Sequence, residues 1–255
     1  MKIRRFFVRF LFMTIILLFF AFVSDISIIN TDHGKNRDRT KIVLETNVAN
    51  KANLKDDIKE EIPVFSKNKL VEENINRIKG LSWKPDAPVK LDELRYIKVT
   101  YWGFDDKNHI GELVVHEKVA DEVVEIFKEL YEAKFPIEKI KIIDEYNADD
   151  NLSMDDNNTS SFNYRVVAGT KTLSKHSYGL AIDINPVQNP YIKGQAIQPK
   201  KGKKYTDRSN IRKGMIVRGD VCYKAFVSRG WIWGGEWKTV KDYQHFQKDV
   251  NLRNN

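Results

Sequence analysis

The segment 174–186 limits the possible folds of this chain more than any other part of the sequence. Gly179 permits a tight bend, and residues 180–184 have the apolar pattern of a short strand that leads away from the bend. His176 and Asp183 lie seven positions apart, which is too far for one turn of a helix. A bend followed by a strand can nevertheless aim both side chains at one point.

A second short motif, Asp242-Tyr-Gln-His245, lies near the C-terminus. A catalytic zinc ion takes three protein ligands and keeps a fourth position for water, so His245 is the natural third ligand beside His176 and Asp183. Asp242 is the best candidate for the general base that takes a proton from that water. The spacing from Asp242 to His245 predicts a turn before the strand that carries the histidine. The spacing of His176 and Asp183 alone also fits a surface histidine and a capping aspartate.

Several motifs occur together in one order. They are Ser-x-His-x-x-Gly-x-Ala-x-Asp-x-x-Pro at 174–186, Trp-Gly-Gly-x-Trp at 233–237 and Asp-x-x-His-Phe at 242–246. With this order and spacing the chain resembles the zinc D-alanyl-D-alanine carboxypeptidase and L-alanyl-D-glutamate endopeptidase family, the VanY-like peptidases. The resemblance implies that zinc binds to the matching residues His176, Asp183 and His245, and that Asp242 is the base. Many members carry Glu at the base position, and the Asp found here is also used by the endopeptidase branch.

The same resemblance implies which residues contact the substrate. The segment 158–165 matches the family segment with a substrate-anchoring arginine, so Arg165 would hold a substrate carboxylate or carbonyl and stabilise the oxyanion. A surface salt bridge is the alternative for Arg165. Ser174 and Tyr178 are expected to line the site. Trp233 would form a wall beside the metal or, equally well, belong to the hydrophobic core.

The N-terminal residues 1–30 have the composition of an export signal. Basic residues at positions 2, 4, 5 and 9 precede an uncharged apolar run over 10–23. The run is short for a membrane span, yet no convincing cleavage site follows it, so a cleaved signal peptide and a retained membrane anchor remain alternatives. We expect an exported protein of the cell envelope, either anchored in the membrane or released.

The rest of the chain divides into a charged segment and a folded domain. Residues 31–75 are polar and mixed in charge, which predicts a flexible tether. Residues 76–255 are expected to form the catalytic domain, with strands over 95–102 and 109–115 and a helix over 118–134. We predict an α+β fold in which a small central antiparallel sheet carries the zinc ligands and helices pack around it.

Charge and cysteine content narrow the choice of partners. The formal net charge is +8, which is common in nucleic-acid-binding proteins, but an exported chain seldom meets nucleic acid. A polyanionic cell envelope is the expected partner instead. Cys222 is the single cysteine and falls in a helical pattern, so we interpret it as a core thiol. The basic stretch 189–217 is expected to frame a substrate cleft.

The family resemblance therefore implies a zinc peptidase that cuts peptidoglycan stem peptides, as a D-alanyl-D-alanine carboxypeptidase. Two alternatives stay open: an L-alanyl-D-glutamate endopeptidase, and a zinc-binding or wall-binding module without catalysis. The module is less favoured because the three ligands, the base and the arginine all remain in register, whereas a decayed site would lose at least one of them.

Overall fold

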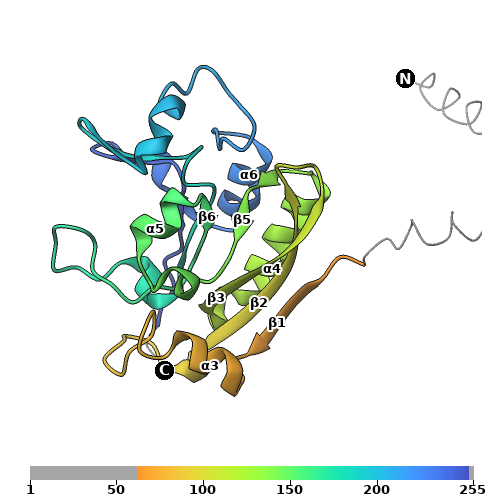
Figure 1. Ribbon diagram of the computed structural model, residues 1–255, viewed down its shortest axis with the longest axis vertical. Helices are drawn as coiled ribbons and strands as arrows, with labels where there is room; N and C mark the ends of the chain where they lie inside the picture. The colour runs from red at the N-terminus through yellow and green to blue at the C-terminus, as the bar shows by residue number, and fades with distance from the viewer. Residues whose placement is uncertain (1–61, 253–255) are drawn as a thin grey trace, which may run out of the picture. The chain divides into compact units, whose positions relative to one another are not determined.

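Figure 1 shows a computed structural model, which describes residues 62–252 of the chain. The segment 1–30, predicted to be a signal peptide or anchor, lies outside the described residues, as does most of the predicted tether. Within 62–252 no helix is both long enough and apolar enough to cross a membrane.

The largest sheet has the antiparallel order β1-β2-β3, with strands Phe65–Lys69, Leu94–Gly103 and Asn108–His116. The short strand β4 (Pro136–Ile137) pairs in parallel with the end of β2. Helix α4 (Glu117–Glu132) lies along this sheet and buries an apolar stripe with helical spacing. The two strands and the helix predicted for this part of the chain are confirmed, with boundaries that differ by one or two residues.

The folded part of the chain begins earlier than residue 76. Strand β1 pairs with β2 in the register Phe65 to Val99 and Lys69 to Arg95. Helix α3 (Glu72–Ile78) follows and buries Ile78 fully. The segment 65–75 was predicted to belong to the tether because it is polar. An edge strand is held by backbone hydrogen bonds, so it needs few apolar side chains and leaves little signal in the sequence.

The acidic, Asn-rich segment 147–161 has the composition of a solvated loop, yet it contains a short helix and a strand, and its residues 157–161 are buried. Asp149 caps helix α5 (Asp150–Asp155) by accepting hydrogen bonds from the backbone amides of Asn151 and Leu152. The neighbouring strands β5 (Lys139–Ile140) and β6 (Asn158–Thr159) pair in parallel. The fully buried Asn158 side chain donates hydrogen bonds to Lys141 O and Ser153 Oγ, both at 3.0 Å. These bonds satisfy the buried polar groups, which allows the segment to leave solvent.

A second antiparallel sheet has the order β10-β12-β7, with strands Ile232–Trp233, His245–Gln247 and Ala181–Asp183. Helix α6 (Val221–Val227) supports it, because Phe226 stacks on Phe246 with ring centroids 4.1 Å apart. This sheet shares one hydrophobic core with α4 and the β2-β3 pair. It is the small antiparallel sheet that the sequence predicts, and the α+β prediction is confirmed.

A third small sheet, β11-β8-β9, joins the basic stretch 189–217 to the C-terminal motif. Its strands are Lys241–Asp242, Tyr191–Lys193 and Ala196–Gln198, and the 3-10 helix η4 (Lys200–Tyr205) follows. The remaining 3-10 helices are η1 (Leu91–Glu93), η2 (Ile143–Tyr146), η3 (Lys175–Tyr178) and η5 (Gly234–Glu236). Cys222 is fully buried in α6, and burial raises the pKa of its thiol, so the prediction of a core thiol is confirmed.

Candidate metal centre

His176 is held by a short turn that the sequence defines closely. Ser174 caps η3, and its Oγ accepts a hydrogen bond from the backbone amide of His176 at 3.2 Å. Gly179 ends the turn with φ of 66°, and a Cβ at this position would lie 2.6 Å from the backbone nitrogen of His116. That amide donates to Gly179 O at 2.9 Å. Only glycine satisfies both the backbone angle and the close approach.

Asp183 and His245 are direct partners in the pairing of β7 with β12. Ile182 and Phe246 are the next pair in the register, and both are fully buried in the core. Because successive side chains in a strand point to opposite faces, Asp183 and His245 project together from the other face of the sheet. The strand register therefore places a carboxylate beside an imidazole.

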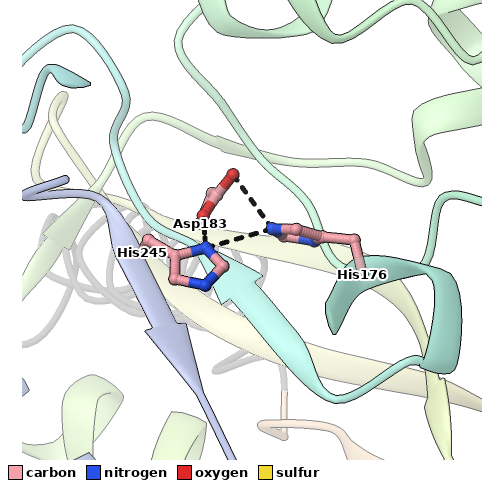
Figure 2. A group of neighbouring side chains, drawn as sticks. All are labelled: His176, Asp183 and His245. Carbon is pink, nitrogen blue, oxygen red and sulfur yellow. Dashed lines mark hydrogen bonds and ion pairs between the residues drawn. The ribbon is translucent and has the colours of Figure 1, made fainter. Parts of the chain in front are cut away.

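His176, Asp183 and His245 converge on one point, as Figure 2 shows. His176 Nε2 lies 3.3 Å from Asp183 Oδ2, and His245 Nδ1 lies 2.9 Å from Asp183 Oδ1. The two imidazoles approach to 3.2 Å between His176 Nε2 and His245 Nδ1. The side chains come from a turn and two strands, and each residue is at most 8% exposed. The structure thus brings together the three ligands that the sequence predicts.

The outer nitrogen of each histidine ring faces an oxygen atom. His176 Nδ1 lies 2.5 Å from the carbonyl oxygen of Ser161, and His245 Nε2 lies 3.1 Å from Gln247 Oε1. Carbonyl oxygens only accept hydrogen bonds, so these two nitrogens carry the protons. His176 Nε2 and His245 Nδ1 are then the nitrogens whose lone pairs would serve a bound metal ion. Two nitrogen donors and one oxygen donor, each oriented by an outer partner, fit Zn²⁺ with one position left open.

Charge within the cluster favours a cation at its centre. Burial by itself would raise the pKa of Asp183, but His176 and His245 outweigh burial and hold that pKa well below its usual range. Burial likewise would lower the pKa of His245, but the Asp183 carboxylate reverses the effect and raises it. The carboxylate therefore stays ionised and draws positive charge to the nitrogens, and a divalent metal ion would supply that charge.

Asp242 lies beside this cluster on strand β11, and residues 243–244 form the predicted bend before His245. A Cβ at Gly234 would lie 2.6 Å from the backbone oxygen of Asp242, so this glycine permits close packing on the strand. Trp233 Nε1 donates to Tyr243 O at 2.8 Å on the other side of the bend. The Trp-Gly pair of the sequence motif thus fixes the position of Asp242.

The Asp242 carboxylate has the properties of a base. Its Oδ1 atom is buried and has no hydrogen-bond partner among residues 62–252. Burial raises the pKa of Asp242 to about 7, with a contribution from the Asp183 charge and against the opposing effect of His245. A base with a pKa near neutral pH can both take up and release a proton at that pH.

Arg165 forms an ion pair through its Nε atom with Asp150 Oδ2 on helix α5. Asn163 Nδ2 donates to the other carboxylate oxygen of Asp150 at 3.0 Å. No hydrogen bond to the two Nη atoms of Arg165 is found within the described part of the chain. The positive charge of Arg165 also lowers the pKa of Asp242, which places it within electrostatic reach of the base. The salt bridge and a role at the site therefore coexist, since the salt bridge uses only Nε.

Ser174 and Tyr178 were predicted to line the site, and Trp233 to form a wall beside the metal or to belong to the core; each has a packing role in the structure. Ser174 is buried, and its hydroxyl is used to cap η3. Tyr178 is half-buried between the two hydrophobic clusters of the domain. Trp233 is 4% exposed and packs in the core with its ring stacked on Phe246. Their polar and aromatic groups hold the elements that carry the metal ligands.

Three residues around the centre were not singled out from the sequence, and a fourth, Trp237, was predicted only as part of a wall beside the metal or of the core. Ser161 and Gln247 orient the histidine rings, and Asp150 holds Arg165. Trp237 is half-buried, with its ring centroid 5.4 Å from that of His245. Trp237 belongs to the Trp-Gly-Gly-x-Trp motif, which was the available signal for it. The other three act through single hydrogen bonds or ion pairs, which no sequence pattern marks.

Replacing Gln247 with Ala tests the orientation of His245. The expected result is a loss of about 10- to 100-fold in zinc affinity, because the Nε2 proton loses its acceptor and the ring is no longer held. Zinc affinity can be measured by competition with a chelator. Gln247→Glu retains an acceptor oxygen and should bind zinc at least as tightly as the wild type. Unchanged affinity in Gln247→Ala would show that the hydrogen bond does not orient the ligand.

The cluster has three residues that could hold a metal ion, and they are of the types that bind catalytic zinc. Residues 168–248 match the family model described as D-alanyl-D-alanine carboxypeptidase. The match covers about a third of the chain and includes the three candidate ligands and Asp242, while Arg165 lies just before it. No curated protein and no solved structure gave a significant match to the chain. The matched family is the one that the sequence motifs resemble, and the match together with the buried cluster supports a metallopeptidase.

Proposed function

We propose that this protein is a zinc-dependent peptidase that hydrolyses peptidoglycan stem peptides as a D-alanyl-D-alanine carboxypeptidase. One observation carries the proposal: within the matched segment, three buried ligands converge beside a carboxylate whose Oδ1 atom has no partner in the described structure. A structural metal site would have its ligand sphere closed by the protein, whereas three protein ligands leave a position open.

His176 Nε2, Asp183 and His245 Nδ1 would hold the ion. When bound there, Zn²⁺ supplies Lewis-acid polarisation of a carbonyl group and lowers the pKa of water. Asp242 takes the proton of the attacking water on its free carboxylate oxygen and delivers it to the leaving amine. The packing of Gly234 and Trp233 around the Asp242 bend keeps this carboxylate in place between the two proton transfers.

Arg165 supports the choice of a carboxypeptidase. Its Nε atom faces Asp150 in an ion pair, and no hydrogen bond to the two Nη atoms is found within residues 62–252, so these are left to bind a planar anion with two parallel hydrogen bonds. The terminal carboxylate of a D-alanyl-D-alanine substrate is such an anion, and it lies next to the bond that is cut. The second candidate is the L-alanyl-D-glutamate endopeptidase, which is favoured by Asp rather than Glu at position 242.

We further propose that the protein acts outside the cytoplasm, in the cell envelope. The basic and apolar segment 1–30 supports export, and a net charge of +8 suits a polyanionic wall. The membrane would be a partner only if this segment is retained. The proposal includes no nucleic-acid partner.

The test is mass spectrometry of defined stem pentapeptides and tetrapeptides incubated with the full chain. We expect the pentapeptide alone to lose one alanine, with the reaction abolished by a chelator and restored by zinc. Release of free L-alanine from both peptides would assign the endopeptidase reaction instead. A protein that binds zinc but yields no product from either peptide would be a non-catalytic module.

A further inference from the structure

A cavity of about 670 Å³ lies between helix α5 and the basic stretch 189–217. Asn151 and Met154 line it from α5, Gln198 from β9, and Lys200 and Lys203 from η4. None of these residues is a candidate metal ligand, and none lies in the motifs that resemble the peptidase family. The cavity is therefore distinct from the metal centre.

Helix α5 connects the cavity to the metal centre. Asp150 at the start of the helix holds Arg165, whereas Met154 one turn later lines the cavity. Met154 Sδ also lies 3.4 Å from the side-chain nitrogen of Gln244, which stands in the bend between Asp242 and His245. Gln244 is 3% exposed, and its Oε1 atom is buried without a hydrogen-bond partner in the described structure. A buried polar side chain thus joins the cavity wall to the bend that carries the base.

The third sheet gives a second, independent connection. Asp242 pairs with Tyr191, and Tyr191 pairs with Gln198, which lines the cavity. Neighbouring strands lie about 4.8 Å apart, so the backbone of Gln198 is about 10 Å from that of Asp242. This separation matches about three residues of an extended peptide. A peptide whose scissile bond lies at the metal centre can therefore reach the cavity with a residue about three positions away.

The positive charge of the cavity and of the stretch 189–217 favours an anionic ligand. Residues 189–217 contain eight Lys and Arg but one Asp and no Glu. Lys200 and Lys203 line the cavity, and neither has an ion-pair partner within residues 62–252. Asp155 is the acidic residue of the lining, and Lys201 Nζ donates to its backbone oxygen at 2.8 Å. Two unpaired ammonium groups against one carboxylate leave the cavity with an excess of positive charge, and the side chains of Asn151 and Gln198 add neutral donors.

We propose that this cavity is a substrate subsite for a carboxylate-bearing residue of the stem peptide, other than the residue whose bond is cut. The proposal rests on the proposed function and deepens it. Stem peptides carry side carboxylates along their length, and in some cell walls these are amidated. Lys200 and Lys203 bind the free carboxylate, so the enzyme prefers the acidic form of the peptide over the amidated form.

The test compares two pentapeptides that differ at the D-glutamate residue, which bears a free carboxylate in one and an amide in the other. In Lys200→Gln/Lys203→Gln, KM for the acidic peptide should rise about tenfold with kcat unchanged, while KM for the amidated peptide stays constant. Lys193→Gln/Lys204→Gln is the matched control, because it removes two charges from the same region outside the cavity lining. An equal rise in KM in the control variant would mean that the lysines attract the acidic peptide only through the overall positive charge of the region. That result would overturn the subsite.

Equilibrium binding separates this inference from the peptidase itself. In an Asp242→Asn background, each peptide is titrated by calorimetry without turnover. A preference for the acidic peptide that disappears in Lys200→Gln/Lys203→Gln supports the subsite even if no peptide is ever cleaved. Equal affinity for the two peptides, both in Asp242→Asn alone and in Asp242→Asn combined with Lys200→Gln/Lys203→Gln, rejects the subsite. Binding of poly(glycerol phosphate) that depends on the two lysines, without any carboxylate preference among peptides, would assign the cavity to a wall polymer and also reject it.

Discussion

Asp242→Asn is expected to lower kcat on the stem pentapeptide by about 10²- to 10⁴-fold, which is the usual contribution of a general base. Asparagine has nearly the same shape, so the close contact with Gly234 and the Trp233 hydrogen bond to Tyr243 remain. The amide cannot accept the proton of the attacking water. Zinc content, measured by elemental analysis, should stay at the wild-type level because the three candidate ligands are unchanged.

The matched control is Asp249→Asn. Asp249 lies seven positions after Asp242, is exposed, and forms an ion pair with Lys175. Its kcat should remain within about twofold of the wild type, since surface ion pairs contribute little. If Asp242→Asn keeps more than a tenth of the wild-type kcat with zinc bound, then Asp242 does not transfer the proton. Another group or the solvent would then be the base.

The ligand set was predictable because local sequence determines most of its geometry. Gly179 permits the bend that carries His176. Because Ile182 points into the core, the next side chain in the strand, Asp183, must point to the opposite face. The pairing of Asp183 with His245 was not predictable in detail, because register between distant strands depends on the whole core. Chemistry filled that gap, since a histidine three residues after an acidic candidate base was the natural third ligand.

The residues that support the ligands left no comparable signal. Four aspartates occur between positions 149 and 156, and only the folded chain shows that Asp150 is the partner of Arg165. Ser161 acts through its backbone oxygen, which any residue type would supply. Ser174 and Trp233 were predicted to contact substrate because they stand in the shared motifs. A residue can also occur in a motif because it holds the site together, and the capping hydroxyl of Ser174 and the core packing of Trp233 do so.

The start of the folded domain and the role of the basic stretch depend on backbone pairing. Strand β1 is polar and exposed at its end, yet it pairs with β2 over its full length. Strand β8 likewise pairs with the strand that carries Asp242. Both are short strands with mixed polarity. Hydrophobic periodicity detects only strands that bury one face, so it cannot identify these two. The length of 189–217 predicted a frame around the substrate cleft, but only the strand pairing connects that stretch to Asp242.

Asp183→Asn is expected to lower zinc affinity by at least about 100-fold and to abolish turnover at stoichiometric zinc. Asp183 supplies the anionic donor of the cluster, and its two oxygens lie 3.3 Å and 2.9 Å from the imidazole nitrogens. An amide offers a weaker, neutral oxygen and can present its NH₂ group to one of the histidines. The cluster then loses both a ligand and the charge that attracts the cation.

Thermal unfolding measures this loss without relying on activity. A ligand that binds only the folded state stabilises it by about 2.7 kcal/mol when present at 100 times its Kd. Zinc should therefore raise the Tm of the wild type and of Asp242→Asn by similar amounts, but should leave the Tm of Asp183→Asn nearly unchanged. Asp242→Asn is the control, because it removes a neighbouring buried carboxylate that is not a ligand. A wild-type zinc shift in Asp183→Asn would remove Asp183 from the ligand set, and the two histidines would then have to bind the ion with a different third group.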